Sequence, residues 1–340
     1  RRGVKSIQFA SNPRGACALL NTHIKSLFVV AALLSASCAP EEAAAPRGGE
    51  TSKGGPARIA LATPIWTEFD AHLAHMTGTE ERTINGVPFV LGEMEGAPVL
   101  LIKTGVSIVN AAATIQLALD AFEISEIVIS GVAGGVDPNL SVGDIVVPAR
   151  WGKFDEMVFL RRTEAGTPTT TPWGEALSFE PFEFMAPRGV YRPDTKDGST
   201  DRQFWFEADA DLMAAAEAAA RKVTLAKCDA AKNCLREAPE AVLGGSGVTG
   251  SVFVDNAEFR DYLYTNFEAQ ASDMETAAVG AVAALNGVPF IAFRSLSDLA
   301  GGGPGANEFP VFKNVAADNA AAFAAAYMAE RASALGAEAQ

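Results

Sequence analysis

The sequence SGVAGGVDPNLSVGDIV occupies residues 130–146 and directly follows the apolar run Ile127–Ile129. An apolar run that ends in glycines is typical of a buried strand leading into a loop. Similar short apolar runs lie elsewhere in the chain, at Arg58–Ala62, Val99–Lys103 and Pro289–Arg294. Segments with helical periodicity separate them. This alternation predicts an α/β fold whose sheet is covered by helices on both faces.

The rest of the chain supplies further elements and one irregular segment. We predict additional strands at 89–91, 144–148 and 241–254, a turn at 92–96, and helices at 67–73 (capped by Thr67), 108–122, 208–223, 256–267, 272–285 and the C-terminus. Residues 151–206 hold three of the four tryptophans, and we interpret them as a long insertion. Its aromatic side chains belong either to the core, to a dimer contact or to a cover over a bound ligand.

The chain is acidic, with a formal net charge of −14 over 340 residues. Residues 1–37 contain five basic and no acidic residues, so removing them changes the formal charge from −14 to −19. A surface of this sign repels phosphate backbones, and we therefore predict that nucleic acid is not a partner.

Residues 1–56 have the composition of a leader and a tether. Lys25 precedes the apolar run Leu27–Leu34, and small residues separate that run from Cys38. A basic flank, a short apolar core and small residues are typical of a secretory signal. Cys38 lies where a bacterial lipoprotein carries its lipid, although Ser35 stands where leucine is usual, and so both lipid attachment and plain cleavage stay open. The segment that follows is rich in Ala, Glu, Pro and Gly, which predicts a flexible tether before a catalytic domain at 57–340. The chain is therefore expected to be exported, either periplasmic or tethered to a membrane.

Two of the four cysteines lie in the predicted domain. Cys228 and Cys234 are close together in a polar segment, and in an oxidising compartment we expect them to form a local disulfide. The alternative is two free thiols. A zinc site would need more ligands than this segment offers.

Three carboxylates stand beside apolar strands, where ligand sites of α/β folds gather. They are Glu68, Glu275 and Asp298. Each also has a purely structural explanation. Glu68 can be a favourable acid in the first turn of a helix. Ser272 and Glu275 match a capping box, and Asp298 can hydrogen-bond its own backbone in a turn.

Three ordered motifs turn these candidates into a site. The glycine-rich stretch at 130–146 resembles the signature of the nucleoside phosphorylase superfamily. So do the sequence DMETAA at 273–278 and the sequence RSLSD at 294–298, at the family's spacing. Within that superfamily the chain is most similar to methylthioadenosine/S-adenosylhomocysteine nucleosidases. Residues 250–256, the cysteine pair and residues 297–303 resemble the plant bark storage branch.

This resemblance implies a three-layer fold, with a central twisted mixed sheet flanked by helices, and a purine-binding side of the site. Asp298 would hydrogen-bond or protonate N7 of the base, oriented by Ser297. Phe253 would stack on the purine, and the backbone of Val254 would face its edge. Ala133 and Gly134 of the glycine-rich stretch would also contact the substrate.

On the sugar side, the resemblance implies that Glu275 accepts hydrogen bonds from the ribose hydroxyls beside Met274. Glu68 would activate the attacking water with help from Arg294. No cofactor and no metal are implied, and relatives commonly form homodimers in which the neighbour completes the pocket at the ribose 5′ position.

The chemistry of N-glycoside cleavage fits these residues. The reaction passes through a ribosyl cation, and the purine leaves as an anion unless N7 is protonated. One carboxyl must therefore keep its proton near neutral pH while a second stays ionised to accept the proton of water. An acid at position 298 can donate to N7 and accept from the 6-amino group, which favours adenine nucleosides such as methylthioadenosine or S-adenosylhomocysteine.

Three functions stay open at this point. A nucleosidase is favoured over a phosphate-dependent purine nucleoside phosphorylase, because residues 63–68 contain a glutamate and no arginine to hold phosphate. Val132 stands where the family has a serine beside the water, and Ile65 where it has a methionine. These departures keep a third possibility in view, a nucleoside-binding or storage-type protein without turnover.

Two other patterns carry less weight. Glu68, His72 and His75 could share a helix face as metal ligands, but we interpret them as a solvated face. Glycines 301–303 could hold a phosphate only at the start of a helix, and Pro304 with Gly305 argues against one there.

Overall fold

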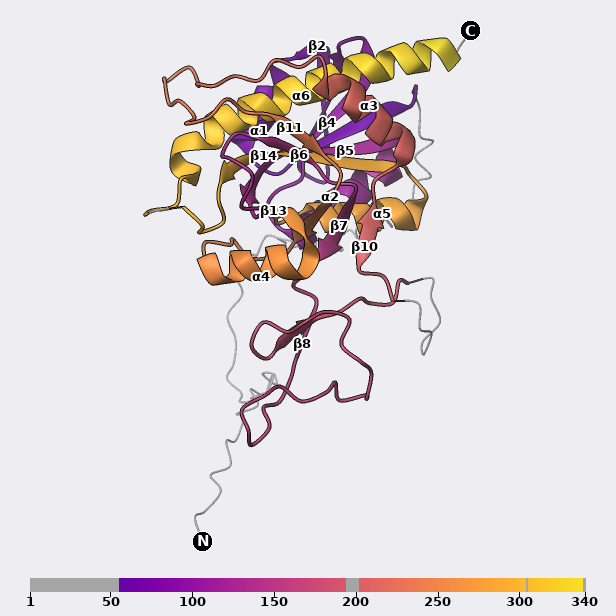
Figure 1. The fold of residues 1–340 in the computed structure, drawn as a ribbon. Coiled ribbons are helices and arrows are strands. Elements are labelled where there is room, and N and C mark those ends of the chain that lie inside the picture. The colour runs from indigo at the N-terminus through magenta and orange to yellow at the C-terminus, as the bar shows by residue number, and fades with distance from the viewer. Residues whose placement is uncertain (1–54, 194–201, 304, 339–340) are drawn as a thin grey trace, which may run out of the picture. The chain divides into compact units, whose positions relative to one another are not determined.

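The computed structural model describes residues 55–193, 202–303 and 305–338, and the side chains as far as 334. Within this part of the chain one sheet of twelve strands forms the centre of the fold (Figure 1). Its strands are β1 (Arg58–Thr63), β2 (Met76–Ile84), β3 (Val87–Met94), β4 (Ala97–Lys103), β5 (Ile124–Gly135), β6 (Ile145–Val147), β7 (Arg150–Lys153), β10 (Trp205–Glu207), β11 (Ala241–Leu243), β12 (Ser246–Thr249), β13 (Ala269–Asp273) and β14 (Phe290–Asp298).

The sheet is mixed, as the resemblance implied. Strands β4, β1, β5 and β14 are parallel neighbours. Antiparallel pairs join β2 to β3, β3 to β4 and β13 to β5. Six helices are described: α1 (Trp66–Leu73), α2 (Ile108–Ala121), α3 (Ala210–Ala220), α4 (Ala257–Phe267), α5 (Thr276–Asn286) and α6 (Phe309–Glu338).

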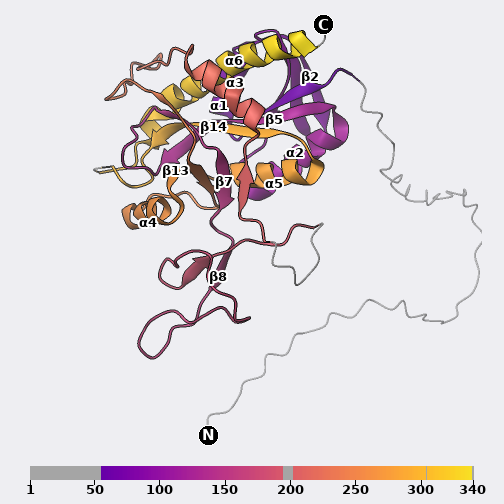
Figure 2. The same ribbon diagram turned by 45° about the vertical axis from the view of Figure 1, so that its right-hand side comes forward.

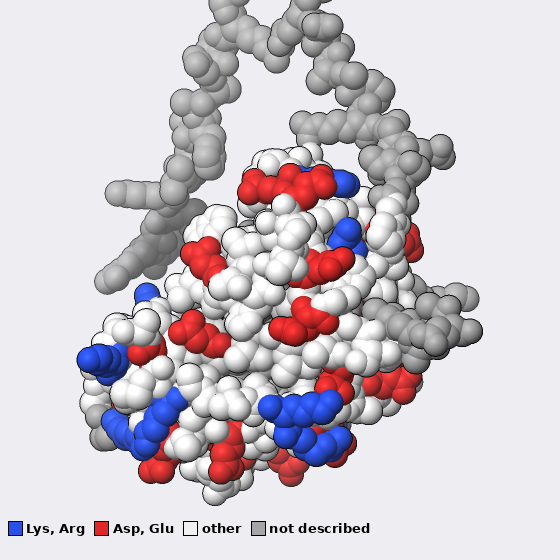
Figure 3. Space-filling model, turned by 90° about the horizontal axis from the view of Figure 1, so that it is seen from above, with Lys and Arg blue, Asp and Glu red and all other residues white. Residues whose placement is uncertain are grey.

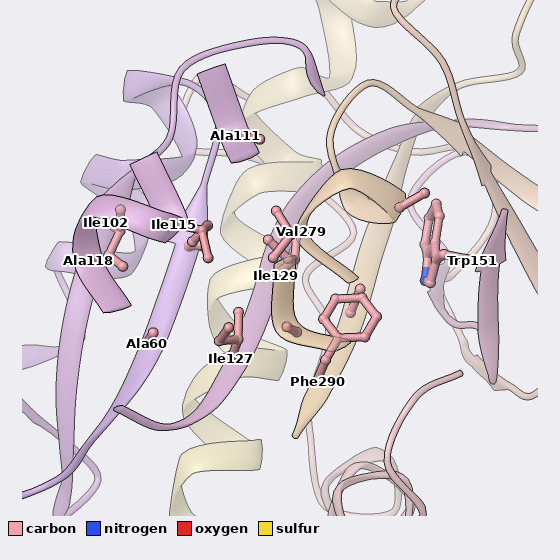
Figure 4. Close-up of a cluster of buried hydrophobic side chains, with 14 of the residues drawn as sticks. Ala60, Ile102, Ala111, Ile115, Ala118, Ile127, Ile129, Trp151, Val279 and Phe290 are labelled. Atoms are coloured by element: carbon pink, nitrogen blue, oxygen red, sulfur yellow. The ribbon is translucent and has the colours of Figure 1, made fainter. Parts of the chain in front are cut away.

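Two hydrophobic cores lie on the two faces of the sheet, because side chains alternate along each strand. In β1, Ala60 and Ala62 face the core that α2 and α5 cover, whereas Ile59 and Leu61 face the core that α1, α3 and α6 cover. Figure 4 shows the first core, in which Ile127 and Ile129 of β5 lie near Ile115 of α2. The predicted three-layer α/β architecture is confirmed.

Several predicted boundaries were wrong. The segment 272–285 is not one helix, since Ser272 and Asp273 end strand β13 and α5 begins at Thr276. Thr67 does not cap α1, whose N-cap is Ile65. The strand that contains residues 127–129 continues through the glycines as far as Gly135, and Gly92 of the predicted turn lies inside β3. Strand β2 was missed because its residues are mostly polar and exposed, with no apolar alternation to reveal them.

The predicted insertion is shorter than 151–206, because β7 and β10 at its two ends pair within the main sheet. Inside it, β8 (Met157–Phe159) and β9 (Met185–Pro187) form a small sheet of their own. The region around β8 extends away from the main sheet in Figure 1 and in the turned view of Figure 2. Trp151 is fully buried in the core, whereas Trp173 is 45% exposed, so the tryptophans have different roles.

The disulfide between Cys228 and Cys234 is confirmed. It closes a short loop whose next residue, Leu235, is buried against Gly143. The leader, Cys38 and the tether as far as residue 54 lie outside the described residues. Among the described helices, none is both long enough and apolar enough to cross a membrane.

Candidate active site

A cavity of about 240 Å³, partly open to solvent, lies at the carboxyl ends of β1, β5 and β14. This is where an α/β fold places ligands. The cavity brings together every residue predicted for the site except Arg294. Its lining residues are Pro64, Ile65, Glu68, Val106, Val132, Ala133, Gly134, Val252, Phe253, Val254, Ser272, Asp273, Met274, Glu275, Ser297, Asp298 and Phe309.

Glu68 enters the cavity from the first turn of α1 and is almost fully buried. Its Oε2 accepts hydrogen bonds from the Thr63 hydroxyl at 2.8 Å and from the backbone N–H of Ile65 at 2.9 Å. Its Oε1 accepts the backbone N–H of Val132 at 2.8 Å. Glu68 thus caps its own helix and also reaches the glycine-rich strand. Burial raises the pKa of its carboxyl, while nearby Arg294 opposes that rise.

The close approach of two charged side chains explains the glycine at position 131 of β5. A Cβ atom at position 131 would lie 2.5 Å from Oε1 of Glu68 and 2.8 Å from Nη1 of Arg294. Only a residue without a side chain leaves room for a carboxylate and a guanidinium at this point of the strand.

Arg294 is fully buried and does not line the cavity. Its Nη2 lies 2.6 Å from Oδ2 of Asp273 and 3.5 Å from Oε2 of Glu275. Arg294 therefore supports the carboxylates from behind rather than facing a ligand directly. Asp273 is the first residue of the motif at 273–278, and the sequence alone predicted no role for its side chain. It accepts a hydrogen bond from Thr249 and contacts Thr276, which ties β12, β13 and α5 to Arg294.

Glu275 stands at the N-cap of α5, but its side chain does not cap that helix. The structural alternative of a capping box is therefore wrong. Its Oε1 instead accepts the backbone N–H of Ser107, just before α2, at 2.8 Å. Burial raises the pKa of Glu275 to about 7, with Asp273 and Glu68 adding to the rise and Arg294 opposing it.

Asp298 ends β14 and is held by both of its oxygens. Oδ1 lies 2.9 Å from the Ser297 hydroxyl, and Oδ2 accepts the backbone N–H of Ala300 and the side-chain N–H of Asn307, each at 3.1 Å. The hydrogen bond from Ala300 confirms that Asp298 bonds its own backbone in a turn. Asp298 nevertheless also lines the cavity. Burial raises the pKa of its carboxyl. Asn307 was missed, because its pairing with Asp298 depends on a loop that sequence patterns do not fix.

Apolar groups form the remaining walls. Phe253 is 57% exposed at the cavity and packs edge-on against Phe309, with ring centroids 5.9 Å apart. Gly134 lies directly beneath Asp298, since a Cβ atom there would lie 3.4 Å from Oδ2. The cavity therefore combines an exposed aromatic ring, buried carboxylates and a close backbone approach, an arrangement suited to a flat heterocycle bearing a polar group.

The interpretation of His72 as part of a solvated face was wrong. His72 is fully buried, its Nδ1 donates to the carbonyl of Glu68 at 2.6 Å, and its Nε2 lies 2.8 Å from the Ser130 hydroxyl. Burial lowers its pKa to about 4, so the ring is neutral at ordinary pH. The described residues contain no cluster of three or more His, Cys, Asp or Glu that could hold a metal.

Comparison with known proteins agrees with this geometry. The model of the phosphorylase superfamily matches residues 58–329. The chain belongs to the phosphorylase superfamily. Among its superfamily relatives, a 5′-methylthioadenosine/S-adenosylhomocysteine nucleosidase from Marinomonas is 32% identical over 72% of this chain and 87% of its own. Bark storage protein B from Populus deltoides is 29% identical over 64% of this chain and 70% of its own.

Solved structures share the fold of this superfamily member. A nucleosidase of the same description from Neisseria meningitidis, in complex with methylthio-immucillin-A, superposes with a TM-score of 0.60 at 22% identity. The superposition covers 81% of this chain and 99% of the Neisseria chain. A third nucleosidase, from Colwellia psychrerythraea in complex with adenine, gives a TM-score of 0.61 at 23% identity over 81% and 96% of the two chains.

The buried carboxyl of Glu275 predicts a pH-dependent stability. Its pKa rises from 4.5 to about 7 on folding, so between these values the folded protein binds more protons than the unfolded chain. This contribution is present below about pH 4.5 and is lost as the pH rises through about 7. Urea denaturation should show wild type losing roughly 3 kcal/mol of stability relative to Glu275→Gln between pH 4.5 and 7.5.

The matched control is Glu217→Gln, which changes an exposed glutamate paired with Arg221 on one helix. Its difference from wild type should not vary over the same pH range. A Glu275→Gln difference that is equally flat would contradict the burial argument.

Proposed function

We propose that this protein hydrolyses the N-glycosidic bond of adenine nucleosides such as methylthioadenosine or S-adenosylhomocysteine, releasing free adenine and the ribose moiety. The observation that carries the proposal is that Glu68, Glu275 and Asp298, far apart in the sequence, line one cavity. Each carboxylate has different partners, so each is suited to a different step.

Asp298 is suited to be the acid. Burial raises its pKa, which favours the protonated form that must donate to N7 of the leaving base. Ser297 lies between Oδ1 of Asp298 and the carbonyl of Ala133, at 2.9 and 3.2 Å. Because a hydroxyl has one proton, it can donate to the carbonyl while Asp298 is protonated and to the carboxylate after the proton has left.

Glu68 is suited to be the base. Burial raises the pKa of its carboxyl, and Arg294 and three hydrogen bonds oppose that rise by stabilising the ionised form that must accept a proton. In the hydrolysis, the oxygen of water bonds to C1′ of ribose as the bond from C1′ to N9 breaks, Glu68 accepts a proton of the water, and the purine leaves protonated by Asp298. The side chain of Val132 offers no donor to the water, but its backbone N–H orients Glu68.

Glu275 is suited to hold the sugar. An ionised carboxylate is purely an acceptor, which matches the two donors of a cis-diol, and its charge stabilises a ribosyl cation nearby. The Ser107 N–H occupies Oε1 at 2.8 Å and orients the group. Phe253 offers an exposed ring on which the base can stack.

Water fits the cavity better than phosphate does. Neither lysine nor arginine is among its lining residues, and Arg294 is engaged with Asp273 and Glu275 behind the wall. A phosphate would instead meet four carboxylates, those of Glu68, Asp273, Glu275 and Asp298. The chain as a whole is also acidic, with a formal net charge of −14, and Figure 3 shows acidic side chains interspersed with basic ones on the face seen from above. These observations argue against phosphorolysis. The similarity to a bark storage protein makes nucleoside binding or storage without turnover the alternative to test.

We propose export as well. Support comes from the signal-like pattern at residues 25–38 and from the Cys228–Cys234 disulfide, since disulfides persist in oxidising compartments. Lipid attachment at Cys38 would then tether the domain through residues 39–56.

We further propose a homodimer. Helices α2 and α5 present an apolar groove that includes Val109, 75% exposed, and Leu285, 52% exposed. The groove begins beside Val106, which lines the cavity, so a second copy seated on it would also complete the site. The insertion supplies Val190 and Tyr191 to the groove and no lining residue to the cavity from its described part. Within one chain, the described part of the insertion therefore does not cover the cavity.

The purified domain should release adenine from methylthioadenosine at the same rate with and without phosphate, and should act poorly on inosine.

Asp298→Ala should reduce release by at least about a thousandfold without unfolding the protein, because the leaving base would no longer be protonated. Chromatography of the free base measures this. Phosphate-dependent release would indicate a phosphorylase, and adenosine binding without release would indicate the storage function.

Expression of the full chain in a bacterium should place the protein outside the cytoplasm. If Cys38 is lipidated, wild type should partition into the membrane fraction and incorporate labelled palmitate, whereas Cys38→Ala should do neither. Protein recovered from the cytoplasm with its leader intact would refute the export proposal.

Light scattering of the purified domain should give twice the mass of the monomer. Val109→Asp, which places a charge on the apolar groove, should shift the protein towards monomer and weaken substrate binding, because the neighbour would no longer complete the site. The matched control is Val311→Asp, an exposed valine outside that groove, which should remain dimeric. A monomeric wild type would refute this arrangement.

A further inference from the structure

Asn307 joins two carboxylates at one edge of the cavity. Its side-chain N–H groups donate to Oδ2 of Asp298 at 3.1 Å and to Oδ1 of Asp255 at 3.0 Å. Its side-chain oxygen accepts the backbone N–H of Phe309 at 2.9 Å, where α6 begins. All the polar atoms of this amide are therefore engaged, and rotating it would break every contact.

The loop that carries Asn307 packs directly on the segment that carries Asp255. A Cβ atom on Gly301 would lie 2.2 Å from the backbone nitrogen of Asn256, so the two backbones touch. Gly302 packs equally closely on the side chain of Arg260, which is itself hydrogen-bonded to the carbonyl of Gly135. Close packing thus explains the glycines at 301 and 302, whereas a Cβ atom at Gly303 would meet nothing nearer than 3.8 Å.

We propose that Asn307 is a positioning residue that orients Asp298 and couples it to the charge of Asp255. The inference rests on the proposed role of Asp298 as the acid. Asn307 and the Ala300 N–H together occupy Oδ2, so they fix the plane of the carboxyl relative to the cavity. Fixing that plane aims the proton that the leaving base must receive.

Asp298 is affected in opposite directions by its two neighbours. The hydrogen bond from Asn307 favours the ionised carboxylate and lowers its pKa, whereas the negative charge of Asp255 raises it. The other charged groups on the elements around it have partners of their own. Glu308 pairs with Arg236 at 2.6 Å, and Arg260 is held by the carbonyls of Gly135 and Asp137. Across the cavity, Glu68 and Glu275 face Arg294, which pairs with Asp273.

The test compares pH profiles of adenine release from methylthioadenosine by the full domain. Asn307→Ala should lower kcat about tenfold with less than a threefold change in KM, because orientation rather than binding is lost. Activity falls as Asp298 loses its proton, so the alkaline limb should move to higher pH in Asn307→Ala. The same limb should move to lower pH in Asp255→Asn, which keeps the shape but removes the charge.

A control variant is Asn139→Ala, which removes an exposed asparagine bonded to the carboxylate of Asp137 and should leave kcat and the profile unchanged. The inference is overturned if Asn307→Ala keeps the wild-type kcat and profile, or if both variants shift the limb in the same direction. Should Asn307→Ala not fold, Asp255→Asn decides alone, and an unshifted limb overturns the coupling. A wild-type enzyme that releases no base would instead refute the proposed function itself.

Discussion

A buried guanidinium is the constraint on which the site depends. Arg294 has no exposed surface, and a charge in that position is tolerated only if it is paired. Asp273 and Glu275 provide the pairing, and Glu68 lies close enough to feel the charge. The strand that passes over it must lack a side chain at position 131. The glycine at position 131 and the placement of two carboxylates in the motif at 273–278 thus both serve one buried charge.

Backbone N–H groups then give each carboxylate its own environment. Glu68 receives one from Val132, Glu275 one from Ser107, and Asp298 one from Ala300. A backbone donor cannot rotate away as a side chain can, so these groups hold the carboxylates in position before any ligand arrives. The charged neighbours of the three carboxyls also differ. Glu68 and Glu275 feel the positive charge, whereas the one charged neighbour that shifts Asp298 is negative. The charges around Glu68 and Glu275 therefore differ from those around Asp298, although burial raises the pKa of all three carboxyls.

The features that distinguish this chain from a minimal nucleosidase lie away from the carboxylates. The insertion joins the sheet through β7 and β10 and packs its aromatic rings on α4, and the disulfide loop places Leu235 against Gly143. Neither lines the cavity in the described part of the chain. The candidate site and these additions therefore occupy separate parts of the described domain.

The sequence alone determined the α/β class, the two-sided sheet and the set of candidate carboxylates, because apolar periodicity and residue type are local properties of the chain. It favoured the local disulfide over two free thiols, and the structure decided between them. It did not reveal β2, whose polar residues form an exposed edge, nor the burial of His72, which depends on Ser130 across 58 positions. Only the tertiary structure decided that Glu275 binds the Ser107 N–H rather than capping its own helix, that Asp273 pairs with Arg294, and that Asn307 holds Asp298. These contacts join strand ends and loops remote in the sequence, and their partners are fixed by how the elements pack.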